Sequence, residues 1–261
     1  RLYVMNQENT NAIDVWDVDT GTVVRQFTEH TLPIGHLSVH DDRLVSTAWV
    51  PVTKTERWDK PAELLVRNGD GTIVFRPQET GVRYFRAALN SDGTRLAATV
   101  EQYGPQGISG DLVRTWDVTT GKVIDELATR SWVLGLKFFE HSNHLAAAEF
   151  DSGDLLIRDP EQQQTVLRLE GVVPQSQDLC LLDHDDRLAA VSRFDFRLIN
   201  LQTGNEVLSQ NLVTFASDYI FNPQLILSSE GRQLLMNQAD GTIRILGDRR
   251  SGDSEPSRSP P

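Results

Sequence analysis

A short pattern that occurs six times constrains the fold of this 261-residue chain more than any other feature. Each copy has a polar residue, a leucine and then mostly small or apolar residues, as in Arg95-Leu96-Ala97-Ala98. The leucines are Leu2, Leu44, Leu96, Leu145, Leu188 and Leu234, so the intervals between them are 42, 52, 49, 43 and 46 residues. A period of this length, built from short strands, is typical of a propeller blade.

The residues around each leucine predict four short strands per repeat, which we name a, b, c and d, with the leucine in strand b. Turn-forming residues such as Ser91-Asp92-Gly93 precede five of the six leucines and join strand a to strand b. Strand c often ends in a polar residue, as in Val113-Arg114-Thr115-Trp116-Asp117, and a turn such as Thr120-Gly121 leads to strand d. Because no long helical period is present, we expect an all-β protein with four-stranded antiparallel blades.

The repeats also set the domain boundaries. Six leucine strands predict a propeller with about six blades over residues 1–247, and the first blade is expected to be incomplete because the chain begins at its strand b. A lone meander exposes its faces and edges, whereas blades in a ring cover one another. We interpret the chain as a fragment of a longer protein. Residues 248–261 contain no large apolar side chain, so they are expected to form a disordered tail.

The repeats resemble those of the WD40 β-propellers, on the Trp-Asp pairs at 16–17 and 116–117 and on the run Asp240-Gly241-Thr242-Ile243-Arg244. The resemblance covers nearly all of residues 1–247, and it implies that both tryptophans pack between blades. In WD40 proteins a Gly-His pair often precedes strand a, and its histidine bonds to an Asp before strand c. Here Glu29-His30 is the best match to the first element, and Asp240, in a different repeat, is the best match to the second. Quinoprotein-type and other divergent propellers remain open, because they share the Asp-x-x-Thr-Gly turn.

Composition excludes several classes of function. The chain has 25 Lys and Arg against 37 Asp and Glu, a formal net charge of −12, which disfavours nucleic-acid binding. No run approaches 18 consecutive apolar residues, so no association with a membrane is expected. The single cysteine, Cys180, cannot form an internal disulfide and lies in an apolar run that predicts a buried strand. A reducing, cytoplasmic location fits this composition.

The sequence offers no recognisable catalytic or cofactor motif. It contains no phosphate loop, dinucleotide fingerprint, Gly-x-Ser-x-Gly elbow or His-Glu-x-x-His helix. His141 and His144 have the spacing of a metal pair, but they fall in a predicted hairpin turn, as do the acidic runs at 151–154 and 183–186. We therefore expect no metal, no cofactor and no catalysis in this region, and leave open a catalytic domain upstream of it.

Two long connections between strands b and c, at residues 50–62 and 102–110, draw attention to one face of the propeller. In the resembled family these loops share a face with the d-to-a loops, one of which contains residues 129–132. Loops on a rigid scaffold commonly carry function, and Trp, Tyr and Arg are enriched at the energetic centres of interfaces. The residues predicted to bind a protein partner are Arg57, Trp58, Lys60, Tyr103, Arg130 and Trp132.

The leading functional hypothesis is a non-catalytic scaffold for protein–protein interaction. The alternative is a propeller enzyme or small-ligand sensor that uses the central channel, as in quinoprotein-like or lactonase-like propellers. That alternative requires a polar pocket with perturbed ionisable groups on the axis. A third reading is a structural element between functional domains.

Overall fold

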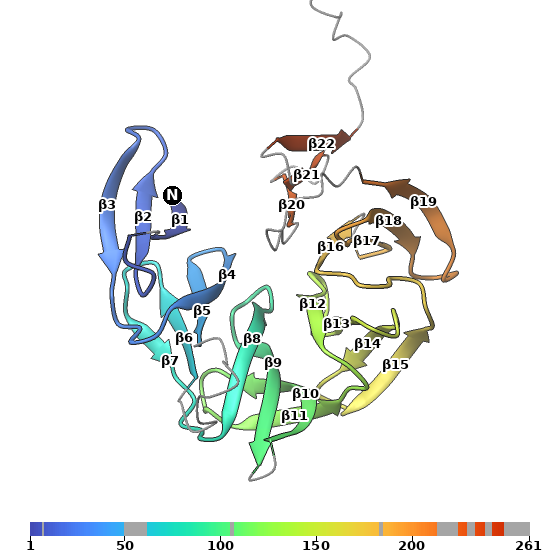
Figure 1. Cartoon of the computed structure of the whole chain (residues 1–261), viewed down its shortest axis with the longest axis horizontal. Coiled ribbons are helices and arrows are strands. Elements are labelled where there is room, and N and C mark those ends of the chain that lie inside the picture. Colours follow the sequence, from blue (N-terminus) through green and yellow to red (C-terminus); the bar gives the residue numbers. More distant parts are fainter. Residues whose placement is uncertain are drawn as a thin grey trace, which may run out of the picture.

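The computed structural model describes residues 1–6, 8–49, 62–104, 107–182, 185–212, 224–228, 233–237 and 242–247. These residues form six small antiparallel sheets, and within each sheet the strands follow one another in chain order. Figure 1 shows the sheets arranged one after another around a common axis. The prediction of an all-β, six-bladed propeller is therefore confirmed.

The blades are numbered in chain order. Blade 1 consists of β1 (Leu2–Met5), β2 (Ile13–Asp17) and β3 (Thr22–Phe27). Blade 2 consists of β4 (Ile34–His40), β5 (Arg43–Ala48), β6 (Glu63–Asn68) and β7 (Ile73–Phe75). Blade 3 consists of β8 (Val82–Leu89), β9 (Arg95–Gly104), β10 (Gly107–Asp117) and β11 (Val123–Ala128). Blade 4 consists of β12 (Val133–Phe138), β13 (Leu145–Glu149), β14 (Leu155–Asp159) and β15 (Gln164–Leu169). Blade 5 consists of β16 (Asp178–Leu182), β17 (Arg187–Val191), β18 (Asp195–Asn200) and β19 (Glu206–Asn211). Blade 6 consists of β20 (Leu225–Leu227), β21 (Gln233–Asn237) and β22 (Ile243–Gly247). The described part of blade 1 lacks strand a, as the sequence predicts, and that of blade 6 lacks strand d.

The repeated leucine has the same role in every blade that has a preceding neighbour. Each lies in the apolar cluster that joins its own blade to the one before it, and each is at most 4% exposed; they are Leu44, Leu96, Leu145, Leu188 and Leu234. Leu2 has no described blade before it and is 55% exposed. The sequence repeat is thus a repeat of interfaces between blades.

Five apolar clusters join the six blades in succession. Among the described residues, no such cluster joins blade 6 to blade 1, and Figure 1 shows the ring open between β22 and β1. Large apolar side chains are exposed on both sides of the opening; they are Leu2, Val4 and Met5 in blade 1, and Ile226, Ile243 and Ile245 in blade 6.

In blades 2 to 5, strand b is buried on both faces, because it lies in the middle of its blade between two neighbouring blades. All five residues of β13 are buried, and three of them are alanines. Small side chains suit a position where the packed blades converge. Cys180 of β16 is likewise buried between blades 5 and 6, as predicted, and burial raises the pKa of its thiol to about 11.

The two tryptophans of the Trp-Asp pairs differ in their packing. Trp116 is fully buried, and its ring centroid lies 6.1 Å from that of Phe75 in blade 2 and 6.2 Å from that of Tyr84. Trp16 pairs with Leu2, on the face of β2 opposite the cluster that joins blades 1 and 2, and is only partly buried. The expectation that these tryptophans pack between blades is met at Trp116, whereas Trp16 lies on the face toward the opening of the ring.

The Asp-x-x-Thr-Gly turns between strands c and d have a common hydrogen-bonding pattern. Asp117 Oδ1 accepts from Thr120 N at 2.7 Å and from Thr120 Oγ1 at 2.9 Å, and Asp17 does the same with Thr20. Gly121 then takes a φ of 71°, which glycine adopts without a steric penalty. The carboxylate closes the turn, and this structural role explains why the motif recurs.

Candidate partner-docking face

The structure describes three of the six residues predicted to bind a partner. Arg57, Trp58 and Lys60 lie outside the described residues. Tyr103 is in β9, whereas Arg130 and Trp132 belong to the loop that precedes β12.

Tyr103 and Trp132 belong to one group of side chains contributed by three blades, which we call the aromatic cluster. Its members are Trp49, Arg83, Phe85, Tyr103 and Trp132. Trp49 and Phe85 lie with ring centroids 5.4 Å apart, and Phe85 and Trp132 are stacked at 6.2 Å with an angle of 25° between ring planes. The guanidinium carbon of Arg83 lies 5.0 Å from the ring centroid of Phe85, 5.3 Å from that of Trp49 and 5.6 Å from that of Tyr103. Such cation–π contacts order the cluster from its centre.

A buried carboxylate holds the centre of the cluster. Glu101 is 1% exposed; its Oε2 lies 3.2 Å from Arg83 Nη1 and accepts a hydrogen bond from the hydroxyl of Tyr103. Burial lowers the pKa of Arg83 and raises that of Glu101, while the attraction between the two charges opposes both shifts. The carboxylate of Glu101 therefore fixes the orientation of both Arg83 and Tyr103.

An irregularity in β8 directs Phe85 into the cluster. The pairing of β8 with β9 shifts between Tyr84 and Ala87, so Phe85 and Arg86 form a bulge. Hydroxyl groups from neighbouring strands b satisfy the bulged backbone: Thr47 Oγ1 donates to Phe85 O at 3.1 Å, and Arg86 N donates to Thr99 Oγ1 at 3.1 Å. Bulges commonly redirect side chains next to functional sites.

The exposed parts of the cluster differ in character. Trp132 is 51% exposed and forms its solvent-facing end. Trp49 lies against Gly35, where a Cβ would come within 2.3 Å of the indole Nε1, so this close approach requires glycine. The side chain of Arg130 is 67% exposed and lies 3.7 Å from Asp154 Oδ2, outside the cluster.

Sequence reasoning missed Trp49, Arg83 and Phe85. The available signal was the run Arg83-Tyr84-Phe85-Arg86, in which two adjacent aromatic residues would point to opposite faces of a strand. Alternation places Arg83 and Phe85 on one face of a strand, but only the structure shows that Trp49 and Trp132 of the neighbouring blades join them there.

The loop before β4 is held by a polar group that we call the second-blade clamp. His30 Nδ1 lies 2.8 Å from Glu63 Oε2, and His30 Nε2 lies 2.7 Å from Ser46 Oγ. Thr31 also donates to the Glu63 carboxylate, from its backbone N at 3.0 Å and from its hydroxyl at 2.6 Å. The histidine expected from the WD40 resemblance is thus in place, but its partner is Glu63 of its own blade, whereas Asp240 lies outside the described residues.

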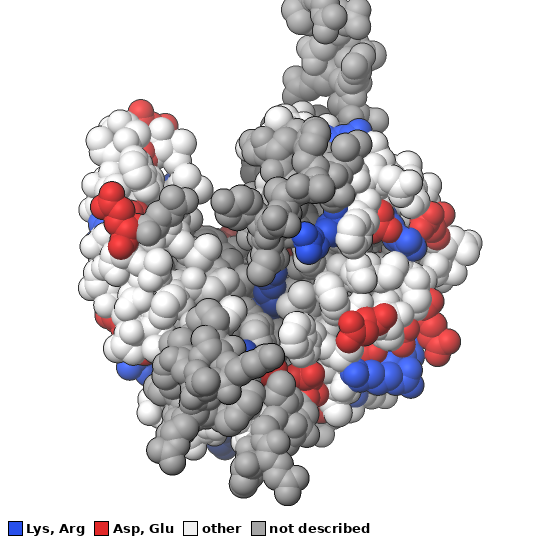
Figure 2. Space-filling model, viewed as in Figure 1, with Lys and Arg blue, Asp and Glu red and all other residues white. Residues whose placement is uncertain are grey.

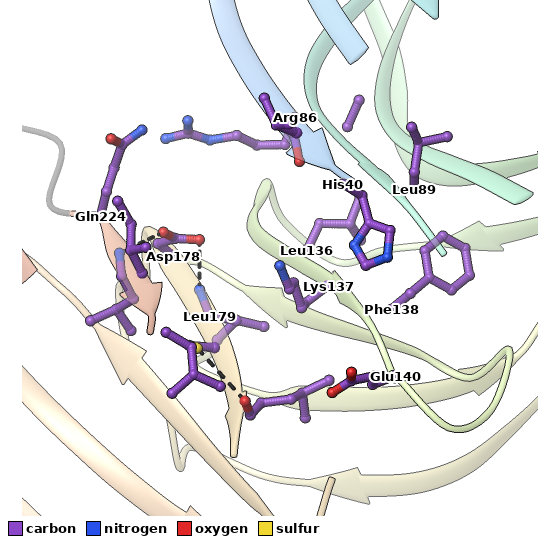
Figure 3. A pocket seen from close by; sticks show the side chains of 18 of the residues that line it. His40, Arg86, Leu89, Leu136, Lys137, Phe138, Glu140, Asp178, Leu179 and Gln224 are labelled. Carbon is purple, nitrogen blue, oxygen red and sulfur yellow. Dashed lines mark hydrogen bonds between the residues drawn. The ribbon is translucent and has the colours of Figure 1, made fainter. Parts of the chain in front are cut away.

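A separate cavity of about 660 Å³ lies on the axis, lined by strand a of blades 2 to 6. Figure 2 shows this hollow near the centre of the molecule, with basic atoms inside it. Figure 3 shows Arg86, Lys137 and Asp178 among the side chains that line it. Burial shifts four lining groups: it lowers the pKa of His36 to about 3, lowers that of Arg86, and raises those of Asp178 and Cys180. In the part of the chain that the structure describes, no three His, Cys, Asp or Glu side chains are grouped closely enough to hold a metal ion.

Comparisons with known proteins identify a fold and no closer relationship. No family model and no curated protein matches the sequence. A chain of the "Crystal Structure of Mitotic Checkpoint Complex" is similar in structure, with a TM-score of 0.67 and 16% sequence identity over 92% of this chain and 69% of that one. At this identity the similarity shows a shared β-propeller fold. No helix in the described segments has the length and hydropathy needed to span a bilayer.

Proposed function

We propose that this chain is a WD40-like, non-catalytic scaffold of the cytoplasm, which binds a protein partner through the aromatic cluster. The observation that carries the proposal is Trp132 of blade 4, a half-exposed indole stacked on a base that blades 2 and 3 supply. Large aromatic side chains on a rigid support lose little entropy on binding and are over-represented among interface hot spots. The structural similarity to a chain of a multiprotein assembly supports the same class of function.

The experiment compares wild-type protein with Trp132→Ala in affinity capture, followed by measurement of Kd with the purified partner. Loss of a hot-spot side chain costs about 2 kcal/mol or more, so we expect Kd to rise about 30-fold. The melting temperature should be unchanged, since half of the indole is already in water. Leu208→Ala, at an exposed apolar position on β19, is the matched control and should bind as wild type does.

The six predicted contact residues are ranked by the same assay. Trp58→Ala tests the segment around Arg57 and Lys60, and Arg130→Ala tests the exposed charge next to Trp132. A Kd that stays the same in Trp132→Ala would contradict the placement of the site, and failure of the wild type to retain any protein partner would contradict the scaffold function.

The alternative function, ligand binding on the propeller axis, is favoured by one observation of its own, the polar cavity with its perturbed ionisable groups. It is compatible with the scaffold function, since the cavity and the aromatic cluster use different side chains of the β8 bulge.

A further inference from the structure

The axial cavity has the size and composition of a binding site for a small molecule. Its volume of about 660 Å³ falls within the range of about 300–1,000 Å³ found for ligand pockets. Strands β4, β8, β12, β16 and β20 all contribute to its wall, so five blades fix its shape (Figure 3). Apolar residues such as Leu136 and Leu179 alternate with a small number of charged side chains.

Arg86 extends into this cavity from the β8 bulge (Figure 3). Among the described residues, its guanidinium group makes no hydrogen bond and no ion pair, although the side chain is largely buried. A guanidinium group has five N–H donors, and leaving them unpaired in a partly desolvated site is costly. The donors of Arg86 are therefore available to a ligand.

The one carboxylate that attracts Arg86 is already engaged in the structure. Asp178 Oδ2 accepts from Leu225 N at 2.8 Å, and Asp178 Oδ1 accepts from Leu179 N at 2.9 Å, so this side chain ties blade 6 to blade 5. Its charge acts on Arg86 from beyond ion-pair contact. Asp178 thus balances part of the positive charge of Arg86 without occupying the N–H donors of the guanidinium group.

Lys137 is the second cation of the cavity. It comes from β12, is exposed to the cavity and makes no ion pair or hydrogen bond with a described residue. Asp178 is attracted by both Arg86 and Lys137, so the two cations share one carboxylate and leave one positive charge in excess. The remaining ionisable side chains of the wall are His36, His40, Asp41, Cys180, Glu140 and Asp185.

The acidic side chains lie toward the other end of the cavity, beyond the ends of strands a. Asp41 follows β4 and Glu140 follows β12, while the carboxylate of Asp185 accepts from the backbone N of Glu140 at 3.1 Å. Figure 3 shows Glu140 and His40 away from Arg86, with Lys137 between them. The excess of positive charge therefore lies on the Arg86 side of the cavity, with Lys137 between that side and Glu140, in a chain whose formal net charge is −12.

We propose that the axial cavity binds a small molecule bearing an oxyanion, a phosphate or a carboxylate, through Arg86 and Lys137. The guanidinium group supplies paired N–H donors that match two oxygens of the anion, and the ammonium group supplies a second charge. Burial of Arg86 in the cavity wall strengthens its interaction with a bound anion. Trp132 and the rest of the aromatic cluster take no part, so this site is separate from the proposed partner-docking face.

The test measures binding of inorganic phosphate and of citrate to the full chain by isothermal titration calorimetry at constant ionic strength. We expect saturable binding of at least one of the two anions, and the stronger one identifies the class of oxyanion. Arg86→Met and Lys137→Met should each raise Kd at least tenfold. Lys122→Met, which removes an exposed charge before β11, is the matched control and should leave Kd unchanged.

Thermal denaturation supplies the second measurement. A bound anion should raise the melting temperature of the wild type more than that of Arg86→Met, whereas the general stabilisation by excluded salts is the same in both. If Arg86→Met does not fold, Lys137→Met decides the outcome, because its side chain is exposed. Equal stabilisation of wild type and variants, or no saturable binding of either anion, would overturn the proposal. Trp132→Ala should retain anion binding, which separates this result from failure of the docking site.

Discussion

Blades 2 and 4 both hold their entry loops with carboxylates, but the carboxylate that accepts the loop's backbone N–H comes from a different position in each blade. In blade 2, Glu63 at the start of strand c bonds to His30 and Thr31, as described above for the second-blade clamp. In blade 4 the matching carboxylate is Asp154, which directly precedes β14. Both carboxylates lie beside the loop that leads into strand a.

The fourth-blade clamp consists of Glu149, Asp154 and Arg168. Arg168 Nη2 lies 3.3 Å from Glu149 Oε2 and 3.0 Å from Asp154 Oδ2. Glu149 Oε1 accepts from Arg130 N at 2.8 Å, in the way that Glu63 accepts from Thr31 N. Thr129 occupies the position of His30, and its hydroxyl is buried without a hydrogen-bond partner among the described residues.

The comparison teaches that the carboxylate is the common element and the histidine is one of several partners it can take. Of these two blades, only blade 2 has a histidine at the position before strand a, whereas the loops of both blades are fixed by an acidic group that receives a backbone N–H. A backbone donor left unpaired near the interior is costly, so this contact is the one that both blades retain.

The largest effect is expected from Glu63→Ala. The substitution leaves His30, which is 4% exposed, without its Nδ1 partner and removes both hydrogen bonds from Thr31. We expect a loss of about 2–4 kcal/mol in the free energy of unfolding, measured by urea denaturation. Glu8→Ala, at an exposed position in blade 1, should change stability by less than about 0.5 kcal/mol. A loss below about 1 kcal/mol for Glu63→Ala would show that the clamp contributes little.

A smaller effect is expected from acid, and it should act on blade 2 first. Burial lowers the pKa of His30, and it lowers that of His36 in β4 to about 3. The unfolded chain therefore binds protons below about pH 6.5 that the folded chain does not, so stability decreases as the pH falls from about 6.5 toward 3. For His36 alone the loss between pH 6.5 and 5 is about 1.7 kcal/mol, because the unfolded histidine is half protonated at pH 6.5 and almost fully protonated at pH 5.

Hydrogen exchange at pH 7 and pH 5, corrected for intrinsic rates, locates this effect. Amides of residues 30–40 should lose protection at pH 5 before those of residues 129–138, since the fourth-blade clamp contains no histidine. His36→Gln should make the free energy of unfolding less dependent on pH, because about one proton fewer is taken up on unfolding. Equal loss of protection in the two blades would refute the assignment to these histidines.

The architecture could be predicted from the sequence because it depends on a periodic requirement. Every strand b must present a leucine to the preceding blade, and this leaves a visible repeat, so the six blades and the incomplete first blade follow from leucine spacing alone. Turn chemistry is equally local, since Asp117 and Thr120 are three residues apart.

The candidate sites could be predicted only in part, because they combine residues that are far apart in the chain. Trp132 was predicted from its loop, but its stacking partner Phe85 lies 47 positions earlier, in a bulge that the alternation of β8 does not reveal. Glu63 begins an apolar run, Glu63-Leu64-Leu65-Val66, and carries no motif of its own. The axial cavity joins five strands a from five repeats, so no local pattern marks Arg86 or Lys137 as neighbours.

The smallest effect, opposite in sign, is expected from Thr129→Val in blade 4. Valine has nearly the shape of threonine without the hydroxyl group, and the Thr129 hydroxyl is buried without a partner among the described residues. Removing an unpaired buried polar group should raise the free energy of unfolding by about 0.5–1 kcal/mol, measured by urea denaturation. The matched change in blade 2, His30→Val, should be destabilising, because His30 is bonded at both ring nitrogens. If Thr129→Val were destabilising as well, the threonine hydroxyl would have a partner of its own, and the two blades would differ less than their side chains indicate.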